Sequence, residues 1–229
     1  MKVLALGAHP DDIEIFMYGF LSLCKSRGDE IFIAIATDGG AGKVLKKENL
    51  VDTRKQETKK GLSFLTDPYF MSFRDGYLIS EPNVFATIKN YIVTVNPDLI
   101  VTHDPNDYHP DHRTLSKIVT DATGFLCPVI FCDTLLGINF KPDFYINITS
   151  FFEEKKRAIL YHKSQNPCKF INAITIQNSF RSAQCNLGVG NYAECYRYEK
   201  RFPFSDISSL IPKTIQNIPY YKNIKNALI

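Results

Sequence analysis

Two four-residue motifs carry most of the chemistry that this sequence can offer. Residues His9–Asp12 read His-Pro-Asp-Asp, and residues His109–His112 read His-Pro-Asp-His. The first and fourth residues of each motif are imidazole or carboxylate side chains, so two such motifs brought together would present both kinds of group to one point. That mixture suits a divalent metal, with zinc as the first choice.

The local backbone should hold each motif at the turn into a helix. Proline biases the preceding histidine toward an extended backbone and is itself preset for the first turn of a helix. One such motif alone would mean no more than a helix start, where aspartate is favoured. Two of them, each after an apolar run, favour a metal site and leave Asp11 for proton transfer. The candidate ligands are then His9, Asp12, His109 and His112.

The composition is that of a globular, unexported protein. The chain has 229 residues and a formal net charge of +3, with acidic and basic residues interspersed, so nothing indicates nucleic-acid binding. The N-terminal apolar stretch is cut off by His9 and Pro10 before a signal-peptide core of ~7–15 residues is complete. No apolar run approaches the ~20 residues of a membrane span. The six cysteines are scattered, without a Cys-x-x-Cys pair, which predicts reduced thiols in the cytoplasm.

Apolar runs that read as strands alternate with segments that have helical spacing. The predicted strands are Val3–Leu6, Ile31–Ala36, Tyr69–Phe73, Leu99–Thr102, Val129–Cys132, Tyr145–Ile148 and Tyr192–Tyr198. The predicted helices cover residues 12–27, 50–62, 82–95, 112–126, 151–161 and 170–184. This alternation predicts one Rossmann-like α/β domain over residues 1–229, with a largely parallel sheet, helices on both faces and an irregular tail over 203–229. Both motifs follow strand ends, so the site is expected at the C-terminal ends of the strands.

These motifs resemble those of the PIG-L/LmbE-like family of metal-dependent de-N-acetylases. Residues Gly7–Ile15 are similar to the family's first motif, in the form seen in the bacillithiol branch. Further likenesses are the loop 37–40, the arginine-bearing segment 53–57, the second metal motif 106–113, and weaker signatures at 162–165 and 192–194. The resemblance covers about residues 1–200.

The resemblance implies a role for each candidate side chain. It implies three metal ligands, which are His9, Asp12 and His112. It makes Asp11 the general base and His109 the group that stabilises the oxyanion, provided that its imidazole is protonated. It also implies that Arg54 reaches the substrate pocket. Asp38, on the loop at the rim of the site, is a second substrate-binding candidate. The expected metal is Zn²⁺, with another divalent metal such as Fe²⁺ left open.

The predicted function is removal of the N-acetyl group from an N-acetylated amino sugar or sugar conjugate, which releases acetate and a free amine. Asp11 would take a proton as the nucleophile adds to the amide carbon and return it to the departing amine. Two alternatives stay open: hydrolysis of another acyl amide, N-formyl or longer, and a noncatalytic sugar- or nucleotide-binding module. The expected partner is a small amino-sugar substrate, with no nucleic acid and no membrane span. The resemblance leaves a homo-oligomer open.

Overall fold

The computed structural model describes residues 1–42, 49–200 and 207–213. Within these residues the strands form one sheet, in the order β3-β2-β1-β4-β5-β7-β6. Neighbours from β3 to β5 pair in parallel, and β7 pairs antiparallel with both β5 and β6. The sheet is therefore largely parallel, and the predicted α/β class is confirmed.

The strands match the predicted ones to within one residue at each end. They are β1 Lys2–Gly7, β2 Glu30–Thr37, β3 Tyr69–Phe73, β4 Leu99–Thr102, β5 Val129–Cys132, β6 Phe144–Asn147 and β7 Ala193–Tyr198. The α-helices are α1 Asp12–Phe16, α2 Tyr18–Ser26, α3 Leu50–Gly61, α4 Val84–Val95, α5 Pro110–Thr123, α6 Phe152–Leu160 and α7 Pro167–Gln184. Short 3-10 turns are η1 Leu135–Gly137, η2 Thr149–Phe151, η3 Lys163–Gln165 and η4 Ser208–Leu210.

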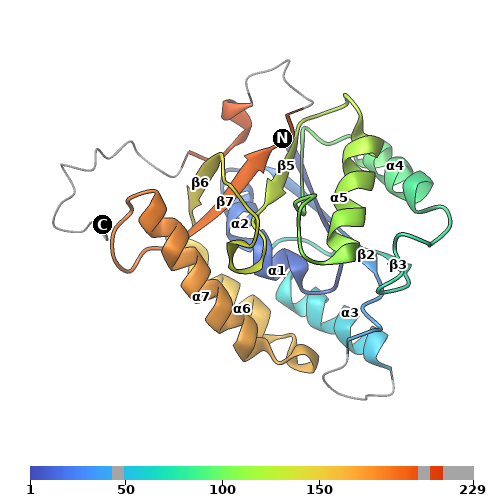
Figure 1. Ribbon diagram of the computed structural model, residues 1–229, viewed down its shortest axis with the longest axis horizontal. Coiled ribbons are helices and arrows are strands. Elements are labelled where there is room, and N and C mark those ends of the chain that lie inside the picture. The colour runs from blue at the N-terminus through green and yellow to red at the C-terminus, as the bar shows by residue number, and fades with distance from the viewer. Residues whose placement is uncertain (43–48, 201–206, 214–229) are drawn as a thin grey trace.

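Alternate residues of β1 face two separate cores. Val3 and Ala5 pack in the core that α1, α2, α6 and α7 share, whereas Leu4 and Leu6 pack in the core under α4 and α5. Figure 1 shows the two groups apart, with α4 and α5 in green and α6 and α7 in orange. Because helices cover both faces, β1 reads as a continuous apolar run rather than as an alternating one.

The first helix differs from the prediction of one helix over residues 12–27. The structure breaks it between α1 and α2 at Met17, which has φ −131° and ψ −5°. Glu194 of β7 accepts hydrogen bonds from the backbone N–H groups of Gly19 and Phe20, both at 2.9 Å. A carboxylate at the start of α2 satisfies N–H groups that a continuous helix would use internally. A contact between distant segments therefore decides the break.

Three further predictions concern the cysteines, a membrane-spanning helix and the C-terminal tail. All six cysteines are free, and four of them are buried. Across the described ranges, no helix has both the length and the apolar character needed to cross a membrane. Most of the predicted tail over 203–229 lies outside the described residues, and the described part, 207–213, contains the turn η4.

Candidate metal centre and active site

The predicted site residues gather at the carboxyl ends of the parallel strands. The motif that follows β1 meets the motif that opens α5, at the edge where open α/β sheets bind ligands. Together with the loops after β2 and β3 they line a cavity of about 300 Å³. Apolar lining comes from three separate elements: Ile15, Phe16, Leu135 and Phe170. The site thus combines ionisable groups with an apolar surface.

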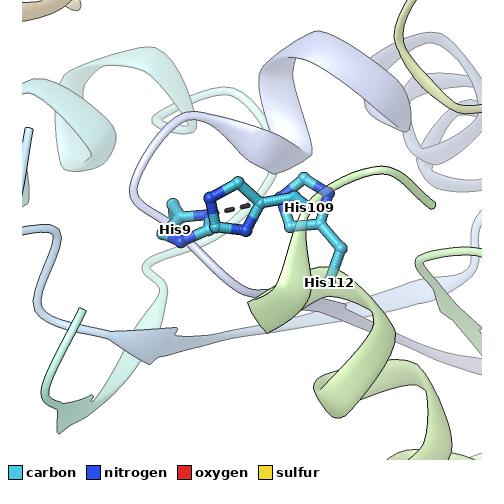
Figure 2. A group of neighbouring side chains, drawn as sticks. All are labelled: His9, His109 and His112. Atoms are coloured by element: carbon cyan, nitrogen blue, oxygen red, sulfur yellow. Dashed lines mark hydrogen bonds between the residues drawn. The ribbon is translucent and has the colours of Figure 1, made fainter. Parts of the chain in front are cut away.

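Three side chains of the two motifs lie close enough to bind one metal ion together. Nδ1 of His9 lies 3.2 Å from Nε2 of His112, although the two residues are 103 positions apart (Figure 2). The carboxylate of Asp12 lies 3.4 Å from Nδ1 of His9 through Oδ2, and 3.3 Å from Nε2 of His112 through Oδ1. All three residues are at least nine-tenths buried. The fold therefore brings two imidazoles and one carboxylate to a common point.

The spacing of these atoms fits a divalent metal. Zinc bonds of about 2.0–2.1 Å at tetrahedral angles place neighbouring ligand atoms roughly 3.3–3.4 Å apart. Burial opposes a charge on His112, but Asp12 and Asp107 outweigh it and raise the pKa of His112 to about 9. Metal ligands must be deprotonated, so a divalent cation that binds here would displace the protons that these side chains hold.

His103, which follows β4, packs against this cluster. Its Nε2 lies 3.0 Å from Oδ2 of Asp12 and 3.1 Å from the backbone nitrogen of Ala8, which donates to it. Its ring stacks on that of His112, with the centroids 3.7 Å apart. His103 also offers an atom within 4.8 Å of ligand atoms of Asp12 and His112. Because the backbone N–H of Ala8 already donates to Nε2, we interpret His103 as a side chain that supports His112 by stacking rather than as a ligand.

His109 faces the cluster from the position just before α5, where it is the N-cap residue. Its Nδ1 accepts a hydrogen bond from the backbone N–H of Asp111 at 3.2 Å, so in the neutral ring Nε2 carries the proton. Burial, together with His9 and His112, lowers the pKa of His109 to about 4. The ring can therefore donate through Nε2 without being an imidazolium. His109 also offers an atom within 4.8 Å of ligand atoms of His9 and His112, which makes it a competing ligand.

Asp11 has an uncommon backbone conformation beside the cluster. Its φ of 149° and ψ of −18° lie in a region that side-chain-bearing residues rarely adopt, which is typical of functional sites. Burial raises the pKa of its carboxyl, although the guanidinium of Arg54 opposes this from 3.1 Å. A buried carboxylate with a raised pKa is suited to accept a proton near neutral pH.

Arg54 of α3 ties the loops of the site together. Its Nη1 donates to the carbonyl oxygen of Gly39 and its Nη2 to that of Pro10, both at 2.9 Å, and Nη2 also pairs with Asp11. Arg54 is buried and lines the cavity. These contacts make it a group that orients Asp11, while its predicted contact with a substrate stays a prediction.

Gly39 lies where a side chain would push this arrangement apart. Its φ is +69°, and a Cβ there would lie 2.8 Å from Cδ of Pro10 and 2.9 Å from Nη1 of Arg54. We expect Gly39→Ala to lower the free energy of unfolding by more than ~1 kcal/mol, measured by urea denaturation. Gly28→Ala is the matched control, because Gly28 has φ +94° but no described atom within 4 Å of its Cβ position. Equal losses in both variants would show that backbone strain, not the clash, is responsible.

Asp38 organises the loop after β2. Its Oδ1 accepts hydrogen bonds from the backbone N–H groups of Gly40, at 2.8 Å, and Asp75, at 3.3 Å. Asp38 therefore joins the loops after β2 and β3. Its predicted contact with a substrate is not tested by these bonds and stays a prediction.

Three carboxylates face the proposed ligands. Sequence reasoning gave no role to Asp75 or Asp107, and it favoured a plain first-turn acid over an orienting carboxylate for Asp111. Asp75 and Asp111 lie 3.2 and 3.4 Å from Nε2 of His9, and Asp107 lies 3.1 Å from Nδ1 of His112. The position of Asp75 in the sequence could have indicated its role, because Asp75 follows the end of β3 by two residues, at the same edge of the sheet as the two motifs.

The sequence is similar to those of several deacetylases. A family model described as GlcNAc-PI de-N-acetylase, PIG-L, matches residues 4–123, more than half of the chain. Diacetylchitobiose deacetylase of Thermococcus kodakarensis is 26% identical over 188 residues, which cover 72% of this chain and 70% of that protein. The probable N-acetyl-alpha-D-glucosaminyl L-malate deacetylase 2 of Bacillus cereus is 29% identical over 185 residues, which cover 71% and 83%.

Solved structures share the fold at lower identity. N,N'-diacetylchitobiose deacetylase from Pyrococcus horikoshii has a TM-score of 0.74 and 24% identity, over 92% of this chain and 88% of that one. GalB, the 4-carboxy-2-hydroxymuconate hydratase from Pseudomonas putida, has a TM-score of 0.72 and 18% identity, over 95% and 99%. Since a deacetylase and a hydratase share this fold, the reaction must be argued from the site and the sequence relatives.

Proposed function

Because the chain belongs to the PIG-L family of de-N-acetylases, we propose that it is a zinc-dependent hydrolase that removes the N-acetyl group of a GlcNAc-type amino sugar or sugar conjugate. The convergence of His9, Asp12 and His112 beside Asp11 in one cavity carries the proposal. Two sequence relatives are named as deacetylases of diacetylchitobiose and of an N-acetylglucosaminyl malate, which supports this substrate class.

We assign the metal to His9, Asp12 and His112. The choice of Zn²⁺ rests on the nitrogen-rich set of three ligands, and Fe²⁺ is left open. When bound, a divalent cation supplies Lewis acidity, which polarises a carbonyl oxygen and lowers the pKa of water beside it.

The other assignments concern protons and orientation. Asp11 accepts the proton of the attacking water and later returns it to the departing amine. His109 donates from Nε2 to the carbonyl oxygen as that oxygen gains negative charge. Arg54 holds the carboxylate of Asp11 in place, and Arg54 and Asp38 remain our candidates for contact with the sugar. The products are acetate and a free amino sugar.

We further propose that residues 1–229 form one catalytic domain that acts in the cytoplasm. One sheet joins strands from β1 to β7, which supports a single domain. Six free cysteines suit a reducing compartment, which supports the location.

Release of acetate and amine by the zinc-loaded protein tests the proposal. We expect turnover of at least one of N-acetylglucosamine, diacetylchitobiose and N-acetylglucosaminyl malate, with loss on chelation and recovery when zinc is restored. N-formyl and longer N-acyl analogues in the same panel test the alternative amide. If the zinc-loaded protein releases no acid from any conjugate, yet the metal-free protein binds one undiminished, the chain is a binding module instead.

A further inference from the structure

The outer nitrogen of His9 faces two carboxylates that the proposed mechanism does not use. Nε2 of His9 lies 3.2 Å from Oδ1 of Asp75 and 3.4 Å from Oδ2 of Asp111. Neither contact has hydrogen-bond geometry, so this buried nitrogen lies between two carboxylates without an aligned hydrogen-bond partner. The other nitrogen of the same ring, Nδ1, faces Asp12 and His112. The two nitrogens of His9 therefore have different partners.

Two segments far apart in the sequence build this pair of carboxylates. Asp111, in the first turn of α5, accepts hydrogen bonds from the backbone N–H groups of Gly76 at 2.7 Å and Leu78 at 3.3 Å. These bonds fasten the loop after β3, which carries Asp75, to α5. Oδ2 of Asp75 accepts from the backbone N–H of Ala41 at 3.0 Å, which leaves Oδ1 to face the imidazole.

This arrangement selects one form of the His9 ring. Acceptors around Nε2 favour the tautomer whose proton is on Nε2, which leaves the lone pair on Nδ1. Nδ1 is the nitrogen that points toward the other proposed ligands. A carboxylate that accepts the outer N–H of a ligating histidine fixes the ring and raises its basicity.

We propose that Asp75 and Asp111 are positioning residues, which lock His9 in the tautomer and orientation that bind the metal through Nδ1. The inference rests on the proposed function, since it requires a metal at His9. Asp75 is the better residue to test, because Asp111 also holds two backbone N–H groups of the loop.

Asp75→Asn separates the charge beside His9 from the packing of the loop. The amide keeps the size of the side chain and an oxygen that can accept the N–H of Ala41, but it removes the negative charge. We expect the zinc affinity, measured by competition with a chelator, to fall ~10–100-fold, and to fall further in Asp75→Ala. The urea midpoint of metal-free Asp75→Asn should match that of the wild type.

Asp38→Asn is the matched control, because Asp38 belongs to the neighbouring loop and accepts backbone N–H groups of Gly40 and Asp75. It should keep the wild-type zinc affinity. Equal zinc affinity in the wild type and Asp75→Asn would overturn the positioning role, and so would equal losses in Asp75→Asn and Asp38→Asn.

Two other results of the zinc measurements can be distinguished from the outcomes above. Two zinc ions per wild-type chain, with the second lost in Asp75→Asn, would also overturn the proposal, because Nε2 would then hold a metal rather than a proton. A wild-type protein that binds no zinc tightly would instead contradict the proposed function itself.

Discussion

Asp11→Asn is expected to lower turnover by ~10²–10⁴-fold while the zinc content stays at the wild-type level. The amide cannot accept the proton that the attacking water must lose, and no proposed metal ligand is altered. Asparagine matches aspartate in shape, so it can occupy the same backbone conformation at φ 149°. Arg54 keeps its two carbonyl acceptors, Gly39 and Pro10, in the variant.

Turnover and zinc content should be measured on the same preparation of Asp11→Asn. Asp98→Asn is the matched control and should keep full activity, because exposed Asp98 precedes β4 at the opposite end of the sheet. Full activity in Asp11→Asn would exclude Asp11 as the base. Loss of zinc together with activity would place Asp11 among the ligands.

His112→Ala is expected to lose zinc and, with it, activity. Nε2 of His112 lies 3.2 Å from His9 and 3.3 Å from Asp12, so the variant removes one of three proposed protein ligands. The loss of zinc affinity should exceed the ~10–100-fold loss that is typical when a residue contacting a ligand, rather than a ligand itself, is changed. Metal analysis after dialysis measures this directly, and full zinc occupancy in His112→Ala would remove His112 from the ligand set.

His109→Ala is the companion variant, because His109 is a competing ligand that lies close to both His9 and His112. It should keep zinc and lose ~10²–10³-fold in turnover, since one donor to the developing oxyanion disappears. Zinc loss in His109→Ala would instead make His109 a ligand beside His9 and His112.

Local sequence determined most of the elements and the chemical content of the site. The strands were predicted to within one residue, because an apolar run covered on both faces is a short-range signal. The second motif places its histidine and proline at a helix start as predicted: His109 is extended, at φ −82° and ψ 130°, and Pro110 is the first helical residue, two residues before the predicted start at 112. The two motifs also indicated the family, which the match over residues 4–123 confirms.

Tertiary structure decided how those residues are arranged. At the first motif, α1 begins at Asp12, two residues after Pro10, and the intervening Asp11 takes a positive φ beside buried Arg54. Glu194, far along the chain, breaks the predicted first helix. Asp75 reaches His9 because β3 and β1 end at the same edge of the sheet. Each of these outcomes depends on contacts between strands and helices that are distant in sequence, and the local preference of a residue carries no information about such partners.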